Sequence, residues 1–440
     1  MILIKNGRLM DPASGLNGLF DILIDGEKIV RIGMCGSLDD MAHESAGMGL
    51  LDECLGTDQE LTEIDATGCV VAPGLVDGHV HFRDPGFTYK EDIESGAKAA
   101  ARGGFTSVVM MGNTEPHMDN EDTIKDALQR GSLTGINVYC CGNVTKDMAG
   151  KELVDMDRLI AAGAVLFTDD GKPITDAGLM ERACTEAAGR GMVISLHEEN
   201  PEFITDNGIN AGEVAEKLGL SGSPRQAEIS MVERDIEIAE RTGAEIVVQH
   251  ISAAESVELI RKAKARGVRV HAEATPHHFT LTQDAVLRFG ALAKMNPPLR
   301  LESDRLAIIE GLKDGTIETI ATDHAPHSRE EKKKELRQAP SGITGLETSL
   351  ALGIKELVKP GYMSLMELID RMTTGPARIY GIDAGKLTEG AVADIVIFSP
   401  DEEWDFVSSV SKSSNTPFLG QRLPGKIYDT ICRGKIVYHC

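Results

Sequence analysis

Two patterns in the sequence predict an α/β protein built on a (β/α)8 barrel. Between residues 74 and 380, short Val/Ile-rich runs alternate with Ala-, Glu- and Lys-rich stretches of helical periodicity, whereas both chain ends show strand-like patterns only. Such alternation is typical of a parallel sheet, and eight units in order close into a TIM barrel. We therefore expect a barrel at residues 73–385 and a small β-sandwich-like domain made of residues 1–72 and 386–440.

The small domain is predicted from alternating apolar and polar residues at both ends of the chain. At the N-terminus, MILIKNGRLM and DILIDGEKIVRIG alternate in this way, and their Asn-Gly and Asp-Gly pairs form turns. Residues 36–65 are acidic and poorly periodic, and we interpret them as a surface excursion. Residues 385–401 and 426–440 are again strand-like, and we expect them to pair with the N-terminal strands.

The barrel is predicted from eight runs that end in polar residues. They are GLVDGHVHF, FTSVVMMGN, INVYCCGNV, AVLFTDD, MVISLHEE, EIVVQHIS, VRVHAEATPHH and IETIATDHAPH. The helical patterns between them include EDIESGAKAAARGG, MERACTEAAGRG, AESVELIRKAKARG and DRLAIIEGLKDG. Most of these end on glycine, the residue that best adopts the left-handed conformation found after a helix C-terminus.

Composition and charge exclude several classes of function. The chain of 440 residues carries 45 Lys+Arg against 69 Asp+Glu, and its net charge of −24 repels phosphate backbones and anionic lipid. We expect no nucleic-acid or membrane partner. The apolar stretches are short, the start of the chain lacks a secretory signal, and the eight cysteines form no CxxC pair, which predicts a cytoplasmic protein with reduced thiols. A small anionic substrate would need local positive charge from arginine, oriented amides or metal ions.

Histidines and carboxylates gather at the C-terminal ends of the predicted strands, which form the active-site face of such a barrel. His79 and His81 are two residues apart on the first strand, so both side chains point to the same side. The fifth and sixth runs end at His197 and His250, and the eighth reaches Asp323. A lone histidine at a strand end is usually a packing residue, but four at matching ends favour a shared site.

The fourth run ends in two adjacent carboxylates, Asp169 and Asp170. Neighbouring strand residues point to opposite faces, so at most one of them reaches the site, and either could instead stabilise the following turn. On the seventh run we interpret His277 and His278 as structural residues. We leave out three histidines that lie outside the strand ends: His43, His117 and His439.

Several imidazoles and carboxylates at one rim suit a divalent metal such as zinc, which accepts nitrogen and oxygen ligands. A bound metal lowers the pKa of its water from 15.7 to roughly 7 and makes hydroxide available at neutral pH. The arrangement therefore predicts a metal-dependent hydrolase.

With these residues in place, the sequence resembles the amidohydrolase superfamily and, within it, the dihydroorotases of the longer bacterial type. The resemblance covers nearly the whole chain and rests on DGHVHFRDPG, MGNTEP, FTDDGKPI, SLHEE, VVQHIS, KMNPPLR, ATDHAPH and SGITGLET. FTDDG and KMNPPLR are the discriminating motifs. Hydantoinases, dihydropyrimidinases and allantoinases are similar in fold, but they usually bridge two metals with a carboxylated lysine, and no lysine lies between Ala161 and Gly171.

The resemblance implies two Zn²⁺ ions per subunit. His79 and His81 match the ligands of the more buried ion, and His197 and His250 match those of the second. Asp170 matches the carboxylate that bridges the two ions together with a hydroxide.

The resemblance also implies the catalytic and substrate-binding residues. Asp323 matches a ligand of the first zinc that also carries the proton in catalysis. The residues that match substrate contacts are His81, Arg83, Asn113, Asn296, His327, Ser341 and Gly342. Ser341 stands where this loop often carries phenylalanine, so the contact of its side chain stays open, whereas Gly342 could offer a backbone amide.

The implied activity is the reversible hydrolysis of (S)-dihydroorotate to N-carbamoyl-L-aspartate in pyrimidine biosynthesis, and the resemblance suggests a homodimer. Arg83 would bind the carboxylate of this small anionic substrate through two parallel hydrogen bonds. The alternative for Arg83 is a salt bridge to Asp84 or Glu91. Two other functions stay open: another cyclic amidohydrolase, such as an allantoinase or a dihydropyrimidinase (hydantoinase), and a non-catalytic scaffold, which we would expect to have lost metal ligands.

Overall fold

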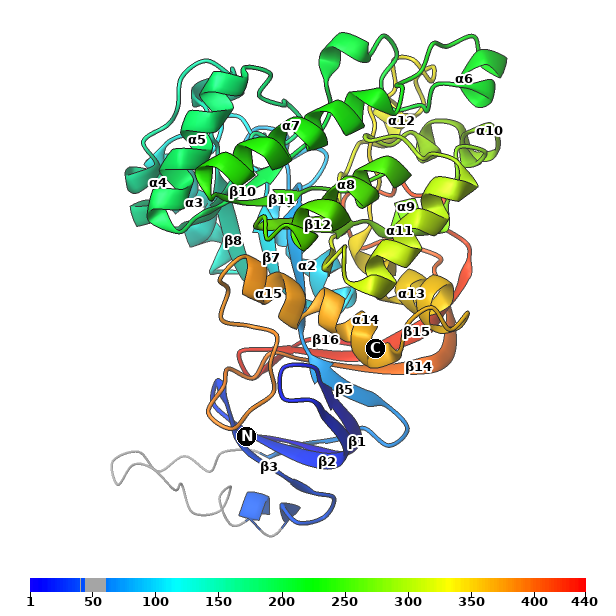
Figure 1. Ribbon diagram of the computed structural model, residues 1–440. Coiled ribbons are helices and arrows are strands. Elements are labelled where there is room, and N and C mark those ends of the chain that lie inside the picture. Colours follow the sequence, from blue (N-terminus) through cyan, green and yellow to red (C-terminus); the bar gives the residue numbers. More distant parts are fainter. Residues whose placement is uncertain (40, 44–60) are drawn as a thin grey trace.

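A computed structural model describes residues 1–39, 41–43 and 61–440 (Figure 1). Two sheets organise the chain, an eight-stranded parallel sheet rolled into a barrel and a mixed sheet to which both chain ends contribute. Both parts of the predicted fold are thereby confirmed. The limits predicted for the two domains stay predictions.

All eight predicted barrel strands are present, and each pairs in parallel with the next. They are β6 (Leu75–Val80), β7 (Phe105–Met110), β8 (Asn137–Gly142), β9 (Ala164–Phe167), β10 (Val193–Leu196), β11 (Glu245–Val248), β12 (Val270–Ala274) and β13 (Thr319–Ile320). The first and last strands meet at a parallel bridge between Val80 and His324, where the His81 N–H donates to the His324 carbonyl (2.8 Å). The barrel is therefore nearly closed.

A helix follows each barrel strand and covers the barrel from outside (Figure 1). These helices are α2 (Ile93–Arg102), α3 (Glu121–Gly131), α4 (Met156–Ala162), α5 (Ala177–Arg190), α7 (Gln226–Thr242), α8 (Ala254–Ala265), α11 (Glu302–Asp314) and α14 (Leu365–Met372). Helices α5 and α11 are followed by Gly191 (φ 66°) and Gly315 (φ 82°), where the left-handed backbone favours glycine. The glycine endings thus mark these helix ends as predicted.

Shorter helices lie in the loops at the barrel mouth and near the C-terminus. They are α6 (Glu213–Lys217), α9 (Pro276–Thr280), α10 (Ala285–Phe289), α12 (Arg329–Lys332), α13 (Ser349–Gly353) and α15 (Thr374–Ile379). Single 3₁₀ turns occur at η1 (Lys146–Met148), η2 (Pro201–Phe203), η3 (Gly290–Ala293) and η4 (Leu346–Thr348), and a π turn occurs at η5 (Ile354–Val358).

The mixed sheet joins the two chain ends in the order β16-β15-β14-β5-β1-β2-β3, with β4 also paired to β1. Its strands are β1 (Ile2–Asp11), β2 (Leu16–Asp25), β3 (Lys28–Met34), β4 (Thr62–Asp65), β5 (Val70–Pro73), β14 (Ile395–Asp405), β15 (Arg422–Cys432) and β16 (Lys435–His439). The junction is the antiparallel pair β5 and β14. Because β5 leads directly into β6, this sheet is fixed to the start of the barrel.

Three further sequence predictions concern the acidic segment, the thiols and membrane-spanning helices. Most of the acidic segment 36–65 lies outside the described residues, although its end forms β4. The described cysteines are free thiols, and Cys140, Cys141, Cys184 and Cys432 are buried. No helix in the described parts of the chain has the length and apolar character needed to cross a bilayer.

A buried polar cluster ties the barrel to the mixed sheet. The side-chain amide of Asn137, at the start of β8, donates to Asp394 (2.8 Å) and accepts from the Arg433 guanidinium (2.7 Å). The Arg433 backbone N–H donates to the same Asp394 carboxylate (2.7 Å). Since buried polar groups must find partners, this cluster fixes how the two sheets meet.

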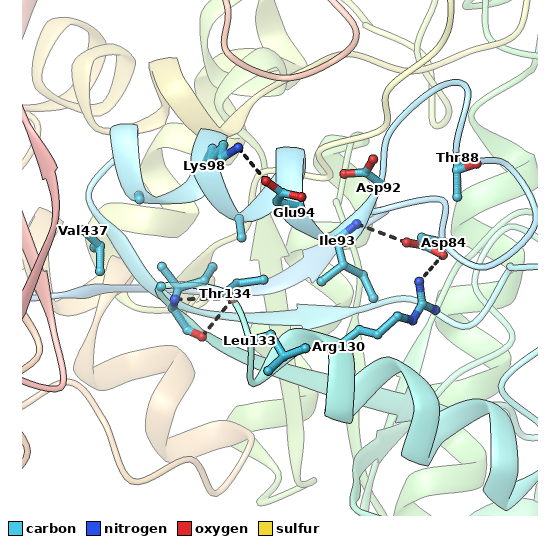
Figure 2. A pocket seen from close by; sticks show the side chains of 14 residues that line it. Asp84, Thr88, Asp92, Ile93, Glu94, Lys98, Arg130, Leu133, Thr134 and Val437 are labelled. Atoms are coloured by element: carbon cyan, nitrogen blue, oxygen red, sulfur yellow. Dashed lines mark hydrogen bonds and ion pairs between the residues drawn. The ribbon is translucent and has the colours of Figure 1, made fainter.

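A cleft of about 540 Å³ lies on the outer side of the barrel, lined by residues of α2, the end of α3 and Val437 of β16 (Figure 2). Four of its charged groups form two pairs: Arg130 contacts Asp84 (2.6 Å) and Lys98 contacts Glu94 (2.7 Å). A second cavity, at the C-terminal ends of the barrel strands, is lined instead by the predicted functional residues.

Candidate metal centre

The barrel mouth encloses a cavity of about 250 Å³. The predicted residues that line it are His81, Arg83, Asn113, Asp170, His197, His250, Asn296, Asp323, His327, Ser341 and Gly342. His79 is fully buried and lies within 3.7 Å of both Asp170 and Asp323. Residues far apart in the sequence thus meet at one place, as parallel strand ends require.

Asp170 lies at the centre of four imidazole rings. Its Oδ1 is 3.5 Å from His79 Nε2, 3.6 Å from His197 Nδ1 and 3.7 Å from His250 Nε2. Its Oδ2 is 3.4 Å from His81 Nε2. These residues form two buried groups of three with metal-ligand geometry, and both groups share Asp170. This arrangement is that of a binuclear metal site.

Asp323 belongs to the half of the site that holds the first histidine pair. Its Oδ1 is 3.1 Å from His81 Nε2 and 3.7 Å from His79 Nε2. The carboxylate therefore lies beside both the predicted ligands and the cavity, where it can contact a bound substrate.

Three of the four histidines donate from one ring nitrogen to an oxygen outside the cluster. These contacts are His79 Nδ1 to Glu273 Oε2 (3.3 Å), His81 Nδ1 to Asn113 Oδ1 (2.9 Å) and His197 Nε2 to Glu199 Oε2 (3.3 Å). Because these oxygens can only accept, each ring carries its hydrogen on that nitrogen and directs the lone pair of the other toward Asp170. This is how metal-binding histidines are usually oriented.

Two observations show that divalent metal ions fit this site. His79 Nε2 is buried and has no hydrogen-bond partner among the described residues. His197 Nδ1 and His250 Nε2 lie 3.0 Å apart, close enough for both to share one ion. Ring nitrogens and carboxylate oxygens are the ligands that zinc and similar ions accept.

The electrostatics of the cluster favour positive charge beside Asp170. Burial alone would raise the pKa of Asp170, but the adjacent histidines, His79 above all, hold it well below its usual value. Burial would lower the pKa of His79, but Asp170 and Glu273 raise it well above its usual value. The carboxylates and imidazoles therefore stabilise one another's charged forms, and the carboxylates provide the negative charge that a bound cation would need.

The backbone is strained at three site residues. Arg83 (φ 59°), His250 (φ 30°) and Asp323 (φ 45°) have positive φ although none is glycine. Such conformations cost roughly 1–3 kcal/mol each and concentrate at functional sites. Here the strain lies at strand ends whose side chains face the cavity.

Sequence reasoning missed the carboxylates that orient the histidines. Glu273 on β12 is fully buried; it contacts His79 and accepts a hydrogen bond from the Tyr380 hydroxyl. Glu199 contacts His197 and accepts from the Asn296 amide (2.9 Å). A carboxylate within the apolar run VHAEA was the available signal for Glu273, because such a group needs a partner.

The structure separates the two candidate carboxylates that follow β9. Asp169 turns away from the histidine cluster and accepts from the backbone N–H groups of Val144 (2.8 Å) and Thr145 (3.2 Å). Burial raises its pKa to about 6. Asp170 faces the cluster, with its two oxygens 3.4–3.7 Å from the four histidine nitrogens.

The seventh-run histidine His278 has structural partners. It contacts the Thr275 hydroxyl (2.7 Å) and the Pro297 carbonyl (3.0 Å). Its adjacent residue His277 is also buried.

Arg83 lacks the salt bridges that were its alternative role. Asp84 instead pairs with Arg130, and Glu91 contacts His324 (3.3 Å). No carboxylate within the described part of the chain lies within 4.0 Å of the Arg83 guanidinium, whose Nε donates to the Pro326 carbonyl (3.4 Å). Its charge is therefore available to an anion in the cavity.

Comparison with known proteins agrees with this site. The sequence profile of the Amidohydrolase family matches residues 70–437. The chain belongs to the amidohydrolase family. Among relatives, it is 54% identical over 439 residues to the dihydroorotase of Clostridioides difficile (strain 630), with full coverage of both chains. It is 48% identical over 438 residues to the dihydroorotase of Lactococcus lactis subsp. lactis (strain IL1403), covering 99% of each chain.

Solved structures of a hydantoinase and a dihydropyrimidinase share the fold. The L-hydantoinase (dihydropyrimidinase) from Arthrobacter aurescens superimposes with a TM-score of 0.85 at 26% identity, covering 100% of this chain and 96% of that one. The dihydropyrimidinase from Brevibacillus agri NCHU1002 superimposes with a TM-score of 0.80 at 23% identity, covering 99% and 95%. Sequence identity over the whole chain thus groups this amidohydrolase with the dihydroorotases.

Replacing Glu273 by alanine tests the orientation of the metal-binding histidines. The variant loses the acceptor that holds His79, so we expect metal affinity to fall by about 10–100-fold. Competition with a chelator, followed by metal analysis, measures the change. Glu347→Ala is the control, because this buried carboxylate contacts Arg102 (2.8 Å) rather than a histidine ligand. Equal metal affinity in both variants would contradict the role of Glu273.

Proposed function

We propose that the protein binds two zinc ions and catalyses the reversible hydrolysis of (S)-dihydroorotate to N-carbamoyl-L-aspartate, the dihydroorotase step of pyrimidine biosynthesis. The observation that carries this proposal is the position of Asp170 between two pairs of histidines. An aspartate at this point, with no lysine on β9, departs from the carboxylated lysine usual in hydantoinases. The full-length likeness to dihydroorotases supports the same choice.

The metal-binding roles follow the two halves of the site. His79, His81 and Asp323 would hold one ion, His197 and His250 would hold the other, and the Asp170 carboxylate would bridge them. When bound, the two ions would supply positive charge that polarises the ring carbonyl and acidifies a water molecule.

Asp323 is the residue that moves the proton. Burial opposes its ionisation, but the close contact with His81 and the neighbouring histidines lower its pKa well below the usual value. The carboxylate is therefore ionised at neutral pH and starts as a base. It accepts the proton of the attacking water and passes it to the ring nitrogen as the amide bond breaks.

Charged and polar groups on the opposite side of the cavity bind the substrate. Arg83 contacts the substrate carboxylate, assisted by Asn113 and Asn296. His327 is neutral, because burial and the nearby charges of Arg83 and Lys90 lower its pKa to about 2. The Lys90 ammonium donates to His327 Nδ1 (3.4 Å), so the hydrogen of the ring lies on Nε2 and is available to the substrate.

The loop beside the cavity differs in one detail from the sequence expectation. The backbone N–H of Gly342 donates to the Lys294 carbonyl (2.9 Å), so it is not the free donor expected for the substrate. Gly342 instead lines the cavity by close approach of its backbone, at φ 134°. The Ser341 hydroxyl donates to Asn207 (3.1 Å) at the edge of the same cavity.

The remaining predictions on assembly and location belong to the same proposal. The resemblance to dihydroorotases supports a homodimer in the cytoplasm. Sedimentation analysis of the purified protein tests the dimer.

A substrate panel separates the proposal from other cyclic amidohydrolases. We expect turnover of dihydroorotate and of N-carbamoyl-aspartate in the reverse direction, because only these substrates carry the carboxylate that Arg83 faces. Hydantoin, dihydrouracil and allantoin should be poor substrates. Their turnover in place of dihydroorotate would show a hydantoinase or an allantoinase, and a metal-loaded protein inactive on the whole panel would favour the scaffold alternative.

Replacing Asp323 by alanine tests the proton carrier. The change removes the base and one metal ligand together, so we expect kcat to fall by at least about 10²–10⁴-fold while the fold persists. Steady-state assays measure the rate, and circular dichroism checks the fold. Glu347→Ala again serves as a buried-carboxylate control with near-normal kcat. A near-normal rate in Asp323→Ala would remove this residue from the mechanism.

Replacing Arg83 by methionine tests the binding of the carboxylate. Loss of the charged hydrogen bonds should raise KM for dihydroorotate by about 10–100-fold with a smaller effect on kcat. Arg130→Met is the control, because this guanidinium is paired with Asp84 on the outer surface. If KM changes equally in both variants, the substrate carboxylate binds elsewhere.

A further inference from the structure

One asparagine from outside the barrel contacts three backbone groups of the cavity wall. Asn415 lies in the segment that connects β14 to β15, far in sequence from the barrel motifs. It is 3% exposed. Its side-chain amide donates to the carbonyls of Ala325 (3.0 Å) and Gly342 (3.0 Å), and its oxygen accepts from the His327 N–H (3.0 Å).

The three residues that Asn415 contacts all line the cavity. Ala325 and His327 follow the eighth strand just after Asp323, whereas Gly342 lies in the neighbouring loop. The side chain uses both amide hydrogens and its oxygen on these backbone groups, so it joins two separate segments of the wall at fixed geometry. The backbone carbonyl of Asn415 adds a fourth contact, because it accepts from the Thr344 backbone N–H (3.2 Å).

Two buried lysines also donate hydrogen bonds to backbone carbonyls of the same loop. Lys294 Nζ donates to the carbonyls of Leu336 (2.9 Å), Arg337 (3.3 Å) and Ala339 (2.8 Å). Lys332 Nζ donates to the carbonyls of Pro340 (2.9 Å) and Gly342 (2.9 Å). The loop forms no regular secondary structure here, so side chains supply the hydrogen bonds that a helix or sheet would provide.

We propose that Asn415 is a positioning residue for substrate binding, which fixes the backbone of Ala325, His327 and Gly342 so that His327 and the loop face the bound ring. The inference rests on the proposed function, because that function assigns His327 and this loop to substrate binding. Asn415 touches neither the predicted metal ligands nor the cavity itself, so it acts only through the segments that it holds.

The expected consequence of losing Asn415 follows from the geometry. Without its three side-chain bonds, the Ala325 carbonyl and the His327 N–H lose the partner that Asn415 gives them, and the Gly342 carbonyl keeps only its bond from Lys332. The lysines and the backbone bonds of the loop then hold it without the side chain that links it to the segment after Asp323. Substrate binding then has to order the loop as well, which weakens affinity. A displacement of about 1 Å at such a wall can cost about 10²-fold in catalytic efficiency.

Kinetics of Asn415→Ala and Asn415→Asp test the inference. We expect KM for dihydroorotate to rise about tenfold or more in Asn415→Ala, with a smaller change in kcat and an unchanged metal content. Asn415→Asp keeps the volume and the acceptor for His327 but loses both donors, so it should release the loop without creating a cavity. Asn137→Ala is the matched control. Asn137 is also buried and makes three side-chain bonds, but it lies at the N-terminal end of β8, whereas the cavity lies at the C-terminal ends of the barrel strands.

Limited trypsin digestion gives a readout that does not depend on the substrate. Arg337 is exposed within the loop, and its carbonyl is one of those held by Lys294. We expect cleavage after Arg337 to be several-fold faster in both Asn415 variants than in the wild type and in Asn137→Ala.

The outcomes separate this inference from the proposed function. If the wild type does not turn over dihydroorotate, the proposed function fails, and the proteolysis still decides whether Asn415 holds the loop. Unchanged KM and unchanged cleavage in the Asn415 variants would overturn the inference, and so would equal changes in Asn137→Ala. Should Asn415→Ala fail to fold, Asn415→Asp and Lys294→Met give the same comparison, and normal KM and cleavage in both would refute it.

Discussion

The structure depends on one buried charge, the carboxylate of Asp170. A buried carboxylate is costly unless positive or hydrogen-bonding groups surround it, and here four imidazole nitrogens lie 3.4–3.7 Å from its oxygens. Three of the four rings are oriented by acceptors on their far side, so their lone pairs point toward Asp170. Two groups of three ligand atoms share Asp170 in this arrangement, which is why we describe it as a metal centre rather than as a hydrogen-bonded core.

The barrel supplies this convergence by closing on itself. Asp77 on the first strand accepts from the Thr322 hydroxyl (2.5 Å) and backbone N–H (3.2 Å) at the end of the eighth, and it also accepts from the His79 backbone N–H (3.0 Å). Burial raises the pKa of Asp77 to about 6, although these bonds oppose the shift. The residue that closes the barrel therefore also positions the first histidine, so fold and site are stabilised by the same contacts.

Much of this architecture could be predicted from the sequence, because its signals are local. Strand periodicity located all eight barrel strands, and the spacing of His79 and His81 placed both rings on one face. The choice between Asp169 and Asp170 could not be made from alternation alone, since either parity was consistent with the strand. Glu273 was visible as a carboxylate in an apolar run, but its partner His79 lies on another strand. Asn415 carried no local signal, because only tertiary packing brings its segment to the cavity.

The net charge of −24 determines where the attraction for the proposed anionic substrate has to come from. A field of that sign repels a carboxylated substrate at long range, so attraction has to come from groups within contact distance. Arg83 is suited to this task because its guanidinium is left without a carboxylate partner while Asp84 and Glu91 pair elsewhere. A half-buried charge without a carboxylate partner and a strained backbone at the same residue are unfavourable for folding alone, which fits the proposal that an anion binds there. The side chains that hold the cavity wall, such as Asn415, then help to keep the Arg83 guanidinium directed at the cavity. Contacts away from the metal centre thereby contribute to the proposed recognition of the substrate.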